Sequence, residues 1–305
     1  MKYNGCQSRS RVLALMKKIN AGILYATFLS LVITGSASAG YVTTGPSLGD
    51  YSYFATPTAW NPGADTARTF TAGDPSAPGG ATWSIMGVGV SAQLPVDITT
   101  GGPVDPHIGT NGLPSTTTAI TSLIAGSTFT SMSTLFNNVI NVWANPSGFT
   151  NLGQVTDDNR NFGVEGSQGD IRIGSIYIDG SSGINTLAHA YQPGNSNIFG
   201  SGWDLAGDVH FDNSNTWTDT GGAGVDLFTV ALHEFGHSLG LGHSTAAGSV
   251  MGGTYTGPLR TLSADDIAGI QSIYGSAVVP LPAAVWLFVS GLIALAGFVR
   301  KRTTI

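Results

Sequence analysis

The chain has 305 residues, only 10% of them charged, and a formal net charge of −6. Its basic residues gather at the two ends. The part between Lys18 and Arg300 contains four arginines, no lysine and all 18 acidic residues. An acidic body of this kind excludes nucleic acid and anionic membrane as electrostatic partners, and the length allows one sizeable domain or two small ones.

Residues 1–39 have the pattern of a secretory signal. A basic stretch precedes an apolar run from Ala21 to Ile33, and Ala37-Ser38-Ala39 forms an A-x-A cleavage site. We expect cleavage before Gly40; an uncleaved membrane anchor is the alternative, for which the apolar run is short. The single cysteine, Cys6, lies in this segment. The mature protein would then carry no disulfide and no thiol that could restrain an active site.

Residues 40–127 are rich in Gly, Pro, Ser, Thr and Ala. Alternating hydrophobicity from Trp83 to Val90 predicts a strand, and the proline-rich segment from Leu94 to Pro114 predicts a long surface loop. His107, within that loop, is expected to be solvated. The sequence leaves open whether this region is part of the fold or a propeptide.

Three regular elements are predicted next. Apolar residues recur at helical spacing from Phe129 to Trp143, and Asn145-Pro146 closes this helix. Residues 149–155 and 170–178 have the pattern of strands. We therefore expect an α+β fold with a mixed, twisted sheet.

The densest cluster of reactive side chains lies in the run H-E-F-G-H-S-L-G-L-G-H, from His233 to His243. A helix that begins at about Leu227 places His233 and His237 on one face, one turn apart. Gly240 can take the left-handed conformation that ends the helix, so that His243 returns to the same point.

Three neutral imidazoles suit a zinc ion with an open fourth position for water. Glu234 lies beside them and is predicted to act as the general base. Each histidine alone could be an ordinary satisfied polar group. Because the chain has only six histidines, the whole set at these spacings points to catalytic zinc.

This run resembles the zinc-binding motif of the metzincin proteases. The serine directly after the third histidine, Ser244, resembles the motif of the matrixin branch of that group. The resemblance implies a metzincin-type catalytic domain at 128–275 with two main helices and zinc-dependent cleavage of peptide bonds. It also implies that Met251 forms a methionine turn under the zinc. Tyr255 would form part of the wall of the pocket that binds the substrate residue after the scissile bond.

The matrixin resemblance extends to further metal ligands. It implies His189 and His210 as ligands of a structural zinc, whose other two family ligands have no counterpart in this sequence. Two imidazoles are half of a tetrahedral set, so the second zinc stays open. Calcium ligands are implied at Asp179, Gly180, Gly183, Asp208 and Asp212, and oxygen donors of this kind suit Ca²⁺. Solvated loop aspartates are the alternative.

The segment from Leu262 to Gly275 resembles the last matrixin helix. Ser263 is predicted to cap it, with Asp265 and Asp266 at its positive end. We assign this helix no chemistry.

Residues 276–305 differ from the rest of the chain. A V-P-L-P-A-A motif from Val279 precedes an apolar stretch, 283–299, and then Arg300-Lys301-Arg302. This pattern predicts a transmembrane segment with a cytoplasmic C-terminus. The whole resembles the PEP-CTERM sorting signal of Gram-negative bacteria, which implies processing by an exosortase and delivery to the cell surface or extracellular matrix. A plain C-terminal anchor is the alternative.

Together these patterns predict an exported zinc endopeptidase that acts on protein or peptide substrates and is processed by signal peptidase and an exosortase-type enzyme. The alternative is a non-catalytic surface or biofilm matrix protein with a structural metal site. A structural site has no need of the acid at Glu234.

Overall fold

The structure is a computed structural model that describes residues 47–48, 51–53, 57–63, 67–70, 77–91, 116–162, 169–178, 186–194, 205–219, 223–277, 287–288 and 290–293. The predicted signal at 1–39, the loop with His107, and most of the predicted sorting tail lie outside these residues. Within the described part of the chain, no helix combines the length and the apolar character needed to cross a membrane.

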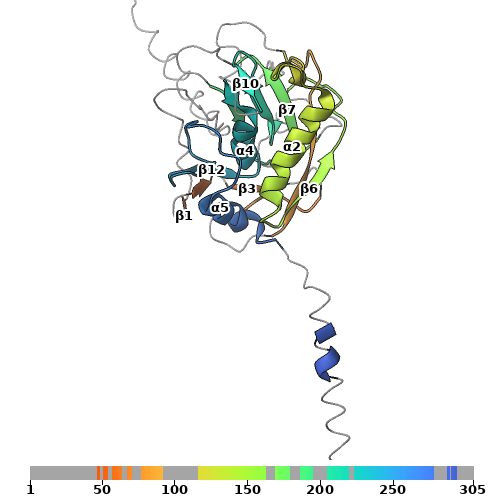
Figure 1. Cartoon of the computed structure of the whole chain (residues 1–305). Helices are drawn as coiled ribbons and strands as arrows, with labels where there is room; N and C mark the ends of the chain where they lie inside the picture. The colour runs from red at the N-terminus through yellow and green to blue at the C-terminus, as the bar shows by residue number, and fades with distance from the viewer. Residues whose placement is uncertain are drawn as a thin grey trace, which may run out of the picture.

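A five-stranded mixed sheet forms the centre of the fold (Figure 1). Its strands, in spatial order, are β6 (Phe149–Gln154), β5 (Gly79–Ile85), β7 (Ile171–Ile176), β9 (Val209–Asp212) and β8 (Ala188–Ala190). The first four are mutually parallel, and the edge strand β8 is antiparallel to β9. The α+β class and the mixed sheet agree with the prediction.

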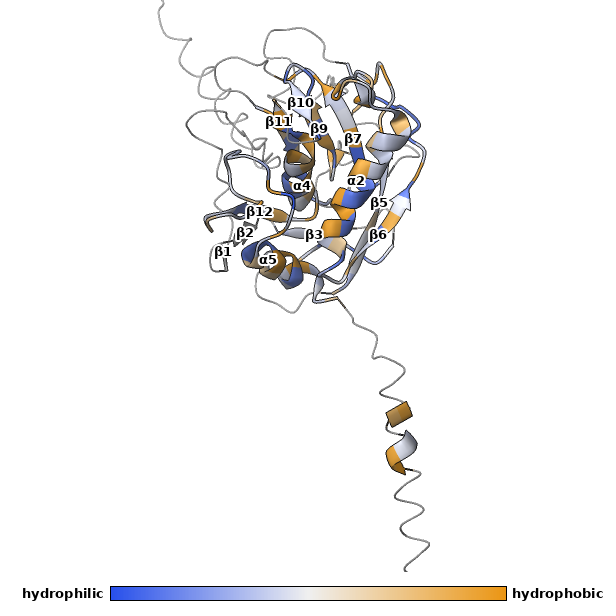
Figure 2. Cartoon of the chain, viewed as in Figure 1, coloured by the Kyte–Doolittle hydropathy of each residue, from blue (hydrophilic) through white to orange (hydrophobic). Residues whose placement is uncertain are grey.

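The helix α2 (Phe129–Ala144) forms where the apolar spacing predicts it. Thr128 caps it by accepting a hydrogen bond from the backbone N–H of Ser131, whose own hydroxyl accepts from the Thr128 N–H. Its apolar and polar residues form separate stripes (Figure 2). The apolar stripe is buried and consists of Met132, Phe136, Val139, Ile140 and Trp143.

The helix α4 (Leu227–Ser238) lies beside α2 against the sheet (Figure 1). Phe136 of α2 stacks on Phe211 of the sheet with 5.8 Å between ring centroids, and on Phe235 of α4 with 6.3 Å. The indole N–H of Trp143 donates to the backbone oxygen of Leu232 at 2.8 Å. These contacts join sheet, α2 and α4 in one core.

The strand β5 differs from the predicted strand over Trp83–Val90. β5 begins four residues earlier, at Gly79, and ends at Ile85, after which residues 88–89 form a turn with Gly89 at a φ of +85°. The apparent alternation is misleading because β5 pairs on both edges and is buried on both faces. Its first glycine is needed for close packing, since a Cβ there would lie 2.3 Å from the backbone oxygen of Trp60.

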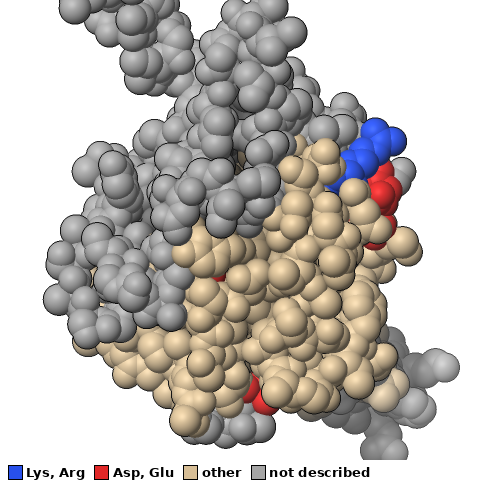
Figure 3. All heavy atoms as spheres, turned by 90° about the horizontal axis from the view of Figure 1, so that it is seen from above, with Lys and Arg blue, Asp and Glu red and all other residues tan. Residues whose placement is uncertain are grey.

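The remaining elements surround this core. β1 (Ser47–Leu48), β2 (Tyr51–Tyr53) and β12 (Leu241–Ser244) form a three-stranded sheet, and β3 (Thr58–Trp60) pairs with β4 (Ala67–Thr69). The others are η1 (Ile120–Ser122), β10 (Trp217–Thr218), β11 (Val225–Asp226) and α5 (Ala264–Tyr274). The described part of the face in Figure 3 carries few charged side chains, as the composition predicts.

Candidate metal centre

The helix α4 is bounded by specific residues at both ends. The Asp226 carboxylate caps it by accepting hydrogen bonds from the backbone N–H and the hydroxyl of Thr229. At the other end Gly240 has a φ of +107°, and a Cβ there would lie 2.4 Å from the backbone oxygen of Thr58. Glycine therefore ends the helix as predicted, and the chain turns directly into β12, which carries His243.

The three predicted ligands meet at one point. One ligand atom from each of His233, His237 and His243 lies within 4.8 Å of the others. The Nε2 atoms of His233 and His237 are 2.9 Å apart. The Nδ1 atoms of the same two rings face the backbone oxygens of Val250, at 2.6 Å, and Leu241, at 2.8 Å.

This hydrogen bonding fixes the tautomers of two ligands. A carbonyl oxygen cannot donate, so Nδ1 of His233 and of His237 carries the proton and each Nε2 presents a lone pair. Two lone pairs that face each other at 2.9 Å repel unless a cation lies between them. The donor set therefore fits a divalent metal ion such as zinc.

Burial keeps the three imidazoles neutral. It lowers the pKa of His237 to about 3, to which the proximity of His243 adds because two imidazolium ions would repel each other, and it lowers the pKa of His243 to about 4. The pKa of His233 is also well below its ordinary value, first through burial and then through its two histidine neighbours. All three side chains are thus ready to bind a metal at neutral pH without first losing a proton.

Glu234 is fully buried next to the ligands. Neither of its carboxylate oxygens has a hydrogen-bond partner among the described residues, and burial raises its pKa well above the ordinary value. An unpartnered carboxyl group in the interior is costly. A divalent cation beside it would favour the charged form. Glu234 thus gives a second observation that fits a bound metal.

Met251 packs against α4, the helix that carries His233 and His237 and is called the zinc helix below; its side chain is 1% exposed. A Cβ on Gly236 of α4 would lie 2.3 Å from its sulfur, so the helix backbone rests directly on this side chain. The turn is held by Asp266 of α5, which accepts hydrogen bonds from the Ser249 hydroxyl and from the backbone N–H of Val250 and Met251. Because Val250 also holds His233, α5 supports the ligand geometry.

Tyr255 is partly buried in the chain segment after the methionine turn. Its hydroxyl accepts a hydrogen bond from the backbone N–H of Asp226 at 3.0 Å. Arg260, further along the segment, donates to the Asp226 carboxylate. The segment is therefore fixed to the beginning of the zinc helix.

The other predicted ligands are only partly described. His189 and His210 lie side by side on β8 and β9, and His189 Nε2 shares a hydrogen bond with His210 Nδ1 at 2.8 Å. Asp208, directly before β9, and Asp212, its last residue, are both buried. Asp179, Gly180 and Gly183 lie outside the described residues. In the part of the chain that the structure describes, only the triad on α4 and β12 brings three His, Cys or acidic ligands together.

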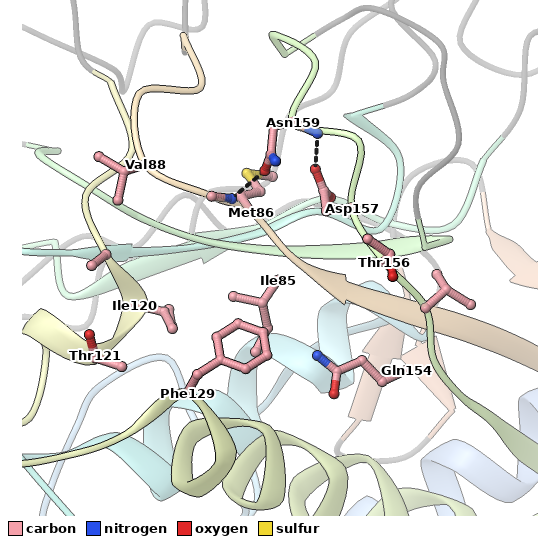
Figure 4. A pocket seen from close by; sticks show the side chains of 13 residues that line it. Ile85, Met86, Val88, Ile120, Thr121, Phe129, Gln154, Thr156, Asp157 and Asn159 are labelled. Carbon is pink, nitrogen blue, oxygen red and sulfur yellow. Dashed lines mark hydrogen bonds between the residues drawn. The ribbon is translucent and has the colours of Figure 1, made fainter.

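A separate hollow of about 710 Å³ lies where β5, η1, β6 and the first turn of α2 meet (Figure 4). Ile85, Ile120 and Phe129 form much of its wall. None of the residues predicted for the metal centre lines it, and its one carboxylate, Asp157, is paired with Arg172. We assign it no chemistry.

Sequence reasoning missed the groups that orient the ligands. The acceptors for His233 and His237 are backbone oxygens, which leave no trace in residue identity. The sequence placed Asp266 in the first turn of α5, and this position explains it without a second role. In the structure Asp266 also binds the methionine turn. No local signal could have found these partners.

Fold and site together define a metalloprotein of the metzincin type, with three histidines, a neighbouring glutamate and a methionine floor. The chain belongs to the matrixin family, whose model matches residues 117–275. Matrixins use catalytic zinc, often with calcium, to cleave peptide bonds.

Individual relatives agree with this membership. The chain is 49% identical to matrix metalloproteinase-25 of Homo sapiens over 110 residues, which are 34% of this chain and 18% of that protein. It is 50% identical to matrilysin of Rattus norvegicus over 94 residues, 30% of this chain and 32% of the relative. It is 42% identical to interstitial collagenase of Equus caballus over 142 residues, 46% and 27%. The chain thus spans a third or less of these relatives.

Proposed function

We propose that this protein is an exported zinc endopeptidase. The observation that carries the proposal is a set of three neutral imidazoles, two buried and one half-buried, beside a carboxyl group that has no hydrogen-bond partner among the described residues. The two buried imidazoles direct their lone pairs at one point. A purely structural site would have no use for Glu234, which argues against a non-catalytic matrix protein.

Each residue has a definite role in this proposal. His233, His237 and His243 would hold the zinc, which supplies a water of lowered pKa and polarises the substrate carbonyl. Glu234 takes the proton of the attacking water and then gives it to the leaving amine. Its burial excludes bulk water from that proton transfer.

The substrate would be a protein or peptide. Tyr255, fixed to Asp226 of the zinc helix cap, would form one wall of the pocket for the residue after the scissile bond. The names of the relatives, matrilysin and interstitial collagenase, agree with a substrate of this class.

Further metal ions belong to the same proposal. Asp208 and Asp212 offer buried carboxylates for calcium, and we include Asp179, Gly180 and Gly183 on the matrixin pattern alone. His189 and His210 face each other as two of the four ligands that a structural zinc would need.

Export and sorting are supported by the sequence at the two ends of the chain. The signal pattern at 1–39 supports cleavage by signal peptidase. The motif and apolar stretch at 276–305 support a transient anchor, processing by an exosortase-type enzyme, and release to the surface or extracellular matrix of a Gram-negative bacterium.

The test is the substitution Glu234→Gln, assayed with a quenched fluorescent peptide library and with zinc content measured in parallel. Glutamine has the same shape but cannot accept the proton, so we expect kcat to fall by a factor of about 10² to 10⁴. Zinc content should stay at the wild-type level because Glu234 is no ligand. A variant that keeps its zinc and also its full activity would overturn the assigned role.

A further inference from the structure

Residues 51–70 lie outside the segment that matches the matrixin family, yet described residues among them, in β2 and β3, contact the segments that carry the metal ligands. We propose that this N-terminal strap, consisting of β2, β3 and β4, positions two of the three zinc ligands, and that Trp60 is its main positioning residue. The inference rests on the zinc site of the proposed function and not on the identity of the substrate.

The first contact is the pairing of β2 with β12. Leu241 pairs with Tyr53 and Ser244 with Tyr51, in antiparallel register. β12 contains His243 and also Leu241, whose backbone oxygen accepts the Nδ1–H bond of His237. The strand β2 therefore holds the segment that supplies one ligand and orients another.

The second contact is made by Trp60 of β3. Its indole N–H donates to the backbone oxygen of Ser238 at 2.9 Å, one residue after His237. Its backbone N–H donates to the hydroxyl of Tyr274, which in turn donates to the backbone oxygen of Leu239. Trp60 is 2% exposed, so both bonds are shielded from water.

These bonds reach the last turn of α4, where carbonyl groups have no partner within the helix. Two of those carbonyls, from Ser238 and Leu239, are thus held by the strap and by α5. Gly240 follows them, packed against the backbone oxygen of Thr58 in β3. The path from His237 to His243 is therefore held at three consecutive residues.

Arg68 of β4 fixes the strap in place. Its guanidinium donates to the backbone oxygens of Trp60, Ala77 and Ile273, which belong to β3, to the segment before β5 and to α5. It also lies 5.8 Å from the centre of the Tyr274 ring. Strap, α5 and the end of the zinc helix thus form one connected unit.

A unit of this kind should raise metal affinity by holding the ligands in their bound geometry. Loss of an outer partner of a ligand typically costs 10- to 100-fold in metal affinity. Trp60 acts through the main chain, so we expect the lower end of this range.

The experiment uses Trp60→Phe in the full-length protein, with the zinc dissociation constant measured by competition with a chromophoric chelator. The substitution keeps an aromatic ring but removes the indole donor. Trp217→Phe is the matched control, since its indole N–H also donates to a backbone oxygen, that of Asp212, at 2.8 Å. Unfolding of the metal-free proteins is measured in parallel.

We expect zinc to bind about tenfold more weakly to Trp60→Phe, with no change in Trp217→Phe even if both are equally destabilised. Equal zinc affinity in wild type and Trp60→Phe would overturn the inference, and so would equal weakening in both variants. If Trp60→Phe does not fold, Tyr274→Phe removes the hydroxyl bridge to Leu239, and unchanged zinc affinity there would equally overturn it. Absence of zinc from the wild type would refute the proposed function instead.

Discussion

Asp157 and Arg172 of β7 form a buried ion pair, with side chains 2% and 1% exposed. Two parallel hydrogen bonds of 2.9 Å join them, and the Ser84 hydroxyl and the Asn159 N–H also donate to Asp157. Burial alone would raise the pKa of Asp157, but the hydrogen bonds and charge of Arg172 hold it below the ordinary value. Arg172 on β7 is thereby tied to the segment after β6.

We predict that Asp157→Asn lowers the free energy of unfolding by about 3–5 kcal/mol at pH 7, because it leaves a buried guanidinium without its counter-charge. The folded pKa of Asp157 lies below its unfolded value, so its contribution is complete above the unfolded pKa and disappears as the pH falls through the folded one. The difference between variant and wild type should therefore shrink in acid. Urea unfolding across this range measures it.

The control for this prediction is Asp158→Asn. Asp158 pairs with Arg160, whose side chain is 54% exposed, so the loss should stay below about 1 kcal/mol. Equal losses at the two positions would contradict the account of the buried pair.

The caps of the two main helices differ in their surroundings. Thr128 caps α2 in an exposed position, with the reciprocal bonds of Ser131. Asp226 caps α4 from a side chain that is 1% exposed, and it also binds Arg260. The start of the zinc helix is thus linked to the segment that carries Tyr255.

We predict a loss of about 1 kcal/mol in the free energy of unfolding for Thr128→Ala and about 2–3 kcal/mol for Asp226→Ala. The larger loss follows because Asp226 accepts from Thr229 and Arg260, which would lose a charged partner. Thermal or urea unfolding of both variants tests this. Equal losses would show that the link to Arg260 adds nothing.

Elements with strong local signals could be predicted from sequence. The stripe from Phe129 to Trp143 and the start of α4 at Leu227 agree with the structure because period and caps are local properties. The bounds of β5 were wrong because its identity depends on partners far along the chain, β6 and β7. For the same reason the hydrogen bond from Trp60 to Ser238, the residue after His237, could not be found.

For the whole molecule, the segment that matches the family does not contain the whole fold. β5 lies between β6 and β7, and Trp60 of β3 and Arg68 of β4 donate hydrogen bonds to α4 and α5. The sequence left open whether residues 40–127 belong to the domain, since their composition is poor in regular patterns. In the structure the residues of β5 form an interior strand of the sheet, between β6 and β7.

We predict that a protein of residues 117–277 does not fold cooperatively, whereas residues 40–277 do. Removal of β5 would separate β6 from β7 and take away the buried side chain of Trp83, which is 2% exposed in the sheet. Thermal denaturation followed by circular dichroism distinguishes the two. A cooperative transition in the shorter protein, with normal zinc binding, would contradict this account.

The central claim is that the triad and Glu234 form a catalytic zinc site. Its most direct test is cleavage of a peptide library by purified residues 40–277, with zinc quantified before and after chelation. We predict one equivalent of zinc at the triad, selective cleavage that chelation abolishes, and recovery when zinc is returned. Full occupancy of the site by zinc without cleavage of any peptide would contradict the claim.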